Sequence, residues 1–119
     1  MSENNNAAKA TETTSIESYK AKYGKVYRIQ ATIEQDDSTS IDHEYYFRKP
    51  QTASYDRYIK TTSQSPTKAL RAFVMDNVVD EQATQLEAHL EEYPAFALSI
   101  GEKLLTVLGL SKEVNLKRL

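Results

Sequence analysis

This 119-residue sequence contains two histidines, His43 and His89, and histidine is a residue type that can support catalysis or bind a metal. Zinc hydrolases commonly hold their metal with two histidines one turn apart on a helix. His89 has no histidine four positions before or after it, and His43 belongs to a separate segment. The spacing therefore predicts no metal site. We expect His43 to be a half-buried strand residue and His89 to be a solvated helix residue.

The acidic residues between positions 80 and 92 are a second candidate for a metal site. Their spacing follows the exterior of a helix rather than the alternating oxygen ligands of a calcium-binding loop. We therefore expect this region to present a solvated helix face. The acidic residues are Asp80, Glu81, Glu87, Glu91 and Glu92.

Ser99 is the residue whose neighbours come closest to those of a catalytic nucleophile. Its segment, 97–101, lacks the first glycine of a nucleophile elbow and falls inside a helical pattern. We therefore expect Ser99 to be a polar residue that interrupts the apolar surface of a buried helix. The chain has no cysteine, which excludes thiolate catalysis, disulfides and cysteine-bound zinc. With only three glycines it also lacks a phosphate-binding loop. We therefore predict a protein that is not an enzyme and has no cofactor.

Basic residues interleaved with aromatic ones at 45–71 form the strongest candidate for a binding surface. Tyrosine and arginine are enriched where proteins meet proteins. The predicted partner-binding residues are Tyr46, Arg48, Tyr55, Arg57 and Tyr58. We expect Tyr46 and Arg48 to point outward from a strand whose other face is buried. Single-stranded nucleic acid is the alternative ligand, because its bases stack on aromatic rings.

The charges are distributed unevenly along the chain. Residues 45–71 carry six basic residues and one acidic residue, a balance of +5, whereas residues 72–102 carry seven acids and no lysine or arginine. The net charge of −2 gives no general attraction for nucleic acid, so a protein partner is favoured. Pairing of the basic region of one copy with the acidic region of the next predicts a head-to-tail homo-oligomer.

The length and composition predict one domain with a polar segment at each end. Hydrophobic residues make up 39% and charged residues 27%, near the globular norm. Residues 1–15 contain one large apolar side chain and are predicted to be disordered, residues 16–110 form the domain, and residues 111–119 form a short basic tail. No apolar run reaches the length of a membrane span, and the first residues lack the apolar core of a signal peptide. The expected location is the cytoplasm.

Two stretches of alternating apolar and polar residues predict a β-hairpin. Tyr27, Ile29, Ala31 and Ile33 occupy one face of a strand over 26–34. After a polar turn the alternation returns over 41–49, with Ile41, His43, Tyr45 and Phe47 on one face. A short helix or turn over 16–23 is expected to lead into the first strand.

Four helices are predicted after the hairpin, giving an α+β fold packed around the last of them. Pro50 ends the second strand, and helical spacing follows over 52–63, 66–78 and 80–93. The helix over 94–108 is apolar on all but a thin strip, so we expect it to form the centre of the core. Gly101 within it predicts a close helix–helix contact, and Gly109 predicts a left-handed cap.

Four segments, taken in order, resemble the small tail assembly chaperones of tailed phages and prophages. They are YYFRKP at 45–50, YDRYIK at 55–60, SPTKALRAF at 65–73 and EEYPAFALSIGEKLLTVLGL at 91–110, and the likeness covers about residues 24–110. The resemblance implies a small cytoplasmic factor, not an enzyme, that binds the long tape-measure protein and protects its hydrophobic helices during tail assembly.

The leading functional hypothesis is therefore a protein-binding module that chaperones a tape-measure or other tail protein. A structural subunit of a tail or contractile particle is the first alternative, using the hairpin edge for strand addition. A nucleic-acid-binding regulator that uses residues 45–71 is the second.

Overall fold

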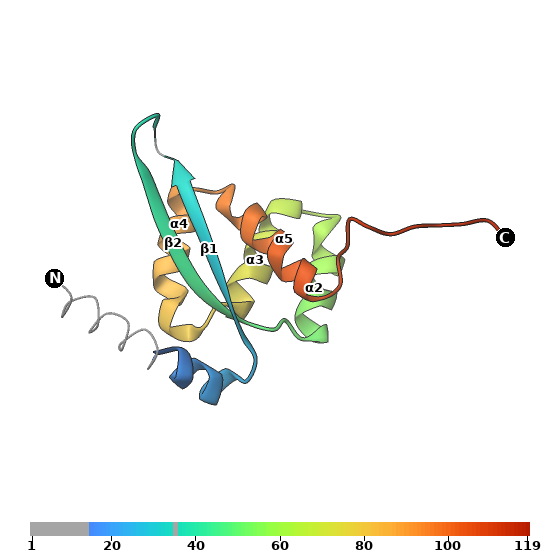
Figure 1. The fold of residues 1–119 in the computed structure, drawn as a ribbon, viewed down its shortest axis with the longest axis horizontal. Helices are drawn as coiled ribbons and strands as arrows, with labels where there is room; N and C mark the ends of the chain where they lie inside the picture. The colour runs from blue at the N-terminus through green and yellow to red at the C-terminus, as the bar shows by residue number, and fades with distance from the viewer. Residues whose placement is uncertain (1–14, 35) are drawn as a thin grey trace.

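The computed structural model of the chain describes residues 15–34 and 36–119. It shows the predicted α+β fold, a two-stranded antiparallel hairpin followed by helices (Figure 1). The first 14 residues of the segment predicted to be disordered lie outside the described residues. Residues 15–23 are helical and end at Gly24, as the spacing of their apolar residues indicated.

The hairpin consists of β1 (Val26–Glu34) and β2 (Ser40–Arg48), and the predicted alternation sets its register. Tyr27 lies opposite Phe47, Ile29 opposite Tyr45, and Ile33 opposite Ile41. Because odd-numbered residues of both strands share one face, that face carries the apolar side chains toward the helices. Strand β2 ends at Arg48, one residue earlier than predicted.

Within the described residues, four α-helices follow the hairpin: α2 (Thr52–Thr62), α3 (Pro66–Asn77), α4 (Ala83–Glu92) and α5 (Phe96–Val107). The helix predicted over 80–93 is divided, because Asp80–Gln82 form a 3₁₀ turn before α4 begins. Pro94 lies in the turn before α5 rather than inside it.

The core lies between the inner face of the hairpin and helices α3, α4 and α5. Its fully buried side chains come from each of these elements: Tyr45, Phe47, Phe73, Val74, Leu86, Leu90, Ile100 and Leu104. Helix α5 supplies much of this core, as predicted, and α3 contacts α2, α4 and α5. The hairpin crosses the helices and its turn projects beyond them (Figure 1).

Both glycines singled out from the sequence occupy positions that suit a residue without a side chain. A Cβ atom on Gly101 would lie 2.3 Å from Cδ1 of Leu70, which confirms the predicted close helix–helix contact and shows that the neighbouring helix is α3. Gly109 has a φ of +108° just after α5, which confirms the predicted left-handed cap.

The prediction that Tyr46 points outward into solvent is wrong. Tyr46 does lie on the outer face of β2, but the helix over 15–23 packs on that face and leaves the side chain only 7% exposed. The ring centroids of Tyr19 and Tyr46 lie 5.4 Å apart. Arg48, on the same face, is half-buried, and its guanidinium group lies over the ring of Tyr23. Both faces of this part of β2 are therefore covered.

Candidate functional site: an apolar groove between two helices

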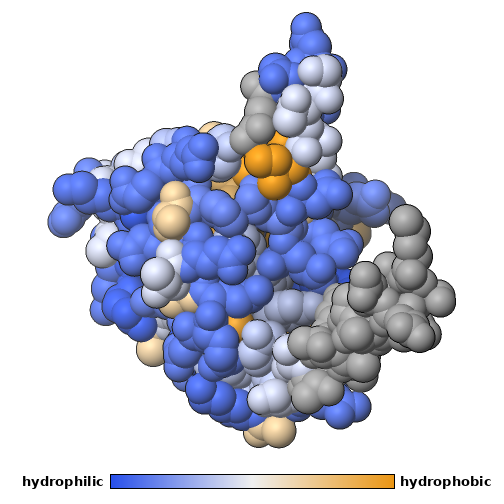
Figure 2. All heavy atoms as spheres, turned by 90° about the vertical axis from the view of Figure 1, so that its left-hand side faces the viewer, coloured by the Kyte–Doolittle hydropathy of each residue, from blue (hydrophilic) through white to orange (hydrophobic). Residues whose placement is uncertain are grey.

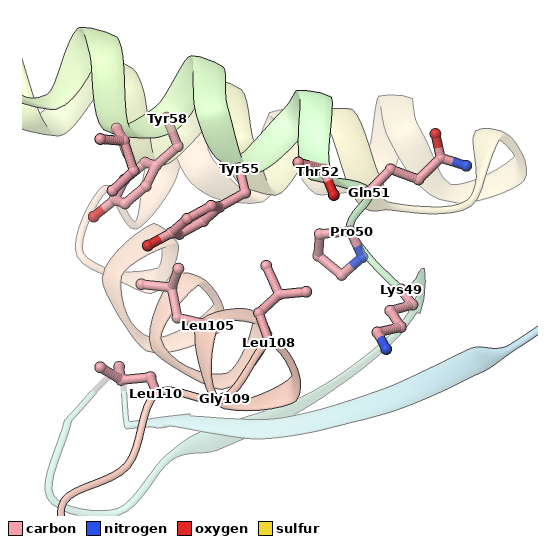
Figure 3. A pocket seen from close by; sticks show the side chains of 11 residues that line it. Lys49, Pro50, Gln51, Thr52, Tyr55, Tyr58, Leu105, Leu108, Gly109 and Leu110 are labelled. Carbon is pink, nitrogen blue, oxygen red and sulfur yellow. The ribbon is translucent and has the colours of Figure 1, made fainter.

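A groove with a volume of about 790 Å³ lies between α2 and the end of α5. One wall is the face of α2 that carries Tyr55, Tyr58 and Ile59, and the other wall is formed by Leu105, Leu108 and Leu110. Figure 3 shows the two tyrosine rings side by side along α2, facing the leucines of α5. Lys49 and Pro50 close one end.

One side chain of the groove is packed on the core, and others expose apolar surface to solvent. The ring of Tyr58 packs on Phe73 of the core, with the ring centroids 5.1 Å apart. Ile59 is 48% exposed and Leu110 is 55% exposed, so both present apolar surface to solvent. Lys49 is the one charged side chain among the described residues that line the groove. Such a surface suits an apolar ligand that is anchored by aromatic contacts.

The five residues predicted to bind a partner do not form one surface. Tyr55 and Tyr58 line the groove, whereas Tyr46 is buried against the helix over 15–23. Arg48 and Arg57 line a separate hollow of about 310 Å³ beside α3. The helix α2 explains this division, because Tyr55 and Arg57 are two positions apart and so project from different faces.

The two arginines converge on Asp76 at the end of α3. Nη2 of Arg48 donates a hydrogen bond to the backbone carbonyl of Asp76 at 2.6 Å, and Arg57 forms an ion pair with its carboxylate at 3.1 Å. Below them, Nδ2 of buried Asn77 donates to Oγ of buried Ser54 at 3.1 Å. These contacts connect β2, α2 and α3, so the arginines have structural partners within the chain.

A cluster of histidine and aromatic rings joins the hairpin to α4. His43 is half-buried, as predicted, but the expectation of a solvated His89 is wrong, because its ring packs on that of His43 with centroids 4.0 Å apart. The hydroxyl of Tyr45 hydrogen-bonds to Nδ1 of His89. Nε2 of His43 is buried, and no hydrogen-bond partner for it is found among the described protein atoms.

Burial changes the acidity of two groups in this cluster. It lowers the pKa of His43, and the neighbouring His89 lowers it further. Burial also raises the pKa of Tyr45 to about 12. Both shifts favour the neutral forms, which suits a packed interface between β2 and α4.

The described residues contain no group of three or more His, Cys, Asp or Glu residues placed to hold a metal ion. Ser99 is exposed on α5. Among the described residues, no helix combines the length and hydrophobicity that a membrane crossing requires.

Sequence reasoning missed the leucine wall of the groove and the contact between the histidines. Leu105 and Leu108 are half-buried and pack against the core, as expected for the helix over 94–108, and they also line the groove opposite α2. A signal for His89 was present, because it stands three positions after Leu86 and four before Tyr93 on the apolar face of α4. The groove itself depends on the tertiary placement of α2, which local spacing does not specify.

Comparison with known proteins places the chain in a family. The family described as "Domain of unknown function (DUF6848)" matches residues 19–117. The chain belongs to this family. It is also similar to a solved structure, that of the uncharacterised protein rbstp2171 from Bacillus stearothermophilus, with 27% sequence identity and a TM-score of 0.74. That similarity covers 86% of this chain and 99% of the other. No curated protein is detectably similar to this DUF6848 chain.

Proposed function

We propose that this DUF6848 protein is a non-enzymatic binding module whose groove holds the apolar face of a helix from another protein. The observation that carries the proposal is the groove itself, two helical walls with tyrosines on one and leucines on the other. Helix-in-groove recognition uses surfaces of this kind, in which apolar anchors of the ligand enter between two helices.

The chemistry of the groove favours a protein helix over a polar small molecule. Ile59 and Leu110 leave about half of their surface in water, and an apolar helix face would cover both. Tyr55 and Tyr58 add hydroxyl groups beside apolar rings, a combination that is enriched at protein interfaces. Lys49 at one end would attract an acidic residue next to the apolar face of the ligand.

We propose the tape-measure protein of a phage or prophage tail as the source of this helix, and the cytoplasm as the place of binding. Support for this finer assignment comes from the resemblance of residues 24–110 to tail assembly chaperones. A tape-measure protein consists largely of long helices with apolar faces, which is the ligand that the groove fits. A chaperone of this kind binds its client before assembly and leaves before the tail is complete.

Binding to single-stranded nucleic acid is less consistent with the geometry. That alternative needs the aromatic and basic side chains of 45–71 on one surface. Tyr46 is buried, and Arg48 and Arg57 are both engaged with Asp76. The tyrosines of the groove are thus separated from the arginines that would neutralise phosphates.

The test is co-expression with the tape-measure-like protein encoded in the same genome, followed by affinity purification. We expect the two proteins to co-purify and the tape-measure protein to stay soluble. Ile59→Lys places a charge in the groove and should weaken retention at least about tenfold. The matched control is Leu98→Lys, since Leu98 is a similarly exposed apolar residue, at 53%, that does not line the groove.

Two results would overturn the proposal. Failure of the unmodified chain to retain the tape-measure protein would remove the chaperone assignment. Equal retention by the Ile59→Lys and Leu98→Lys variants would show that the groove is not the binding site. Recovery of the chain in purified, completed tails would instead support the alternative of a structural subunit.

A further inference from the structure

The two edges of the hairpin differ in whether the chain itself covers them. Along the outer edge of β2, the side-chain amide of Gln82 accepts from the backbone N–H of Tyr46 at 2.7 Å and donates to the carbonyl of Glu44 at 3.3 Å. The N–H of Val79 donates to the carbonyl of Tyr46 at 2.9 Å. This edge is therefore closed to another strand at these positions. Figure 2 shows a largely hydrophilic face on the side of β2 and α4.

The outer edge of β1 has no strand beside it among the described residues. The backbone N–H and C=O of Tyr46 point away from β1. In an antiparallel pair this direction alternates, so the backbone groups of even-numbered β2 residues point to the outer edge, and those of odd-numbered residues bond to β1. The register then directs the backbone groups of even-numbered β1 residues to the outer edge. Gln30, Thr32 and Glu34 are all exposed residues. An uncovered strand edge is a template for pairing with another chain.

The sequence of β1 is complementary to itself when it is read in the opposite direction. Over residues 28–34 it reads Arg-Ile-Gln-Ala-Thr-Ile-Glu. An antiparallel copy centred on Ala31 places Arg28 opposite Glu34, Ile29 opposite Ile33, and Gln30 opposite Thr32. Opposite charges and matched β-branched residues across strands both stabilise pairing. In this register the even-numbered residues of one copy lie opposite even-numbered residues of the other. Their backbone N–H and C=O groups, which point to the outer edge of β1, can therefore form hydrogen bonds between the two copies.

We propose that two copies of the chain associate through β1 about a two-fold axis at Ala31, forming a continuous four-stranded sheet. The apolar faces of both hairpins then lie on the same side of this sheet. A hollow of about 420 Å³ separates β1 from α5 and is lined by Tyr27, Ile29, Leu104 and Val107, among others. Ile33 of the second copy lies opposite Ile29 and can enter this hollow. The pairing thus covers apolar surface that a two-stranded sheet leaves open.

This two-fold arrangement differs from the head-to-tail assembly that the uneven charge distribution predicted. Part of that charge is neutralised within one chain, because Arg57 pairs with Asp76 and Arg71 pairs with Glu91 at 2.5 Å. A two-fold interface is closed and requires no such polarity, since the same residues contribute from both copies.

Cysteine cross-linking of the full chain provides the direct test, because the chain has no cysteine of its own. Residue 31 meets its counterpart in a pair without hydrogen bonds, where Cα atoms lie about 4.5 Å apart. This separation permits a disulfide. Under mild oxidation, Ala31→Cys should form a covalent dimer at least about tenfold faster than Ala53→Cys, an exposed control on α2. Equal rates for the two variants would overturn the proposal.

Sedimentation equilibrium of charge and backbone variants tests the register. Glu34→Arg places like charges opposite each other at both ends of the interface and should weaken dimerisation at least about tenfold. Gln30→Pro removes an outward N–H and should have a similar effect without breaking a bond to β2. The control Glu87→Arg makes the same charge change on the exposed face of α4 and should leave the dimer intact.

A monomer at all concentrations of the unmodified chain would also overturn the two-fold pairing. This outcome is independent of the proposed groove function, because Ile59→Lys should leave the dimer unchanged. Conversely, loss of tape-measure binding in that variant says nothing about β1.

Discussion

The two strands of the hairpin have the same length and nearly the same alternation of residues, yet they have different surroundings. In β2, Phe47 is 0% exposed and Tyr45 is 1% exposed, and its outer edge is bonded to Gln82 and Val79. In β1, the apolar residues Ile29 and Ile33 are only partly buried, and no described strand lies on its outer edge.

This difference separates the part of the molecule that holds the fold together from the part that is available for contacts. Strand β2 joins α3, α4 and α5 in one buried core. Strand β1 and the groove between α2 and α5 both leave apolar surface in water. Substitutions in the first region should therefore change stability, and substitutions in the second should change binding.

The largest expected effect compares two residues that face each other across the hairpin. Phe47→Ala removes a fully buried ring and should cost about 3–5 kcal/mol of the free energy of unfolding. Tyr27→Ala removes its partly exposed partner on β1 and should cost about 1 kcal/mol. Urea denaturation followed by circular dichroism measures both. Equal losses would contradict the division between the strands.

The second prediction concerns the contact between α5 and α3. Gly101→Val introduces atoms where Leu70 already lies and should destabilise the fold by about 1–3 kcal/mol through overpacking. Leu70→Ala creates room, so the same change in that background should cost much less. A double-mutant cycle in urea gives the coupling between the two positions. Additive effects would show that the contact does not limit the residue at 101.

Local patterns in the sequence were sufficient for the elements of the fold. Alternation identified both strands and their buried face, and helical spacing identified α2, α3 and α5 to within a few residues. The close contact at Gly101 could be predicted because glycine destabilises the interior of a helix, and a closely packed neighbouring helix is a reason for its presence there. Each of these features depends on neighbours within a few positions along the chain.

The features that could not be predicted depend on contacts between distant segments. Tyr46 has the alternation of an outward residue, but the helix over 15–23 returns to cover it. His43 and His89 come from different elements and meet only when α4 packs on the hairpin. Of the residues predicted to bind a partner, Tyr55 and Tyr58 line the groove, and the leucines opposite them come from the far end of the chain.

The third prediction uses the histidine cluster to test β2 by pH. The pKa of His43 is lowered in the folded protein, first by burial and then by His89, below its ordinary value of 6.5. The unfolded chain therefore binds a proton more readily, so stability is fully present above about pH 6.5 and falls as the pH decreases through the folded pKa. Urea midpoints should fall over this acidic window by less than Phe47→Ala lowers them. His43→Leu should make the urea midpoint less dependent on pH in this window. A variant whose midpoint changes with pH as much as that of the unmodified chain would contradict the prediction.

The smallest effect is expected in the groove, where Ile59 and Leu98 form a matched pair of exposed apolar residues, at 48% and 53%. Ile59→Lys and Leu98→Lys should each change the free energy of unfolding by no more than about 0.5 kcal/mol, because water already reaches both side chains. Thermal and urea denaturation measure this directly. A loss above about 2 kcal/mol in Ile59→Lys alone would show that the groove belongs to the stabilising core. Near-equality would mean instead that any loss of partner binding in Ile59→Lys arises at the groove surface.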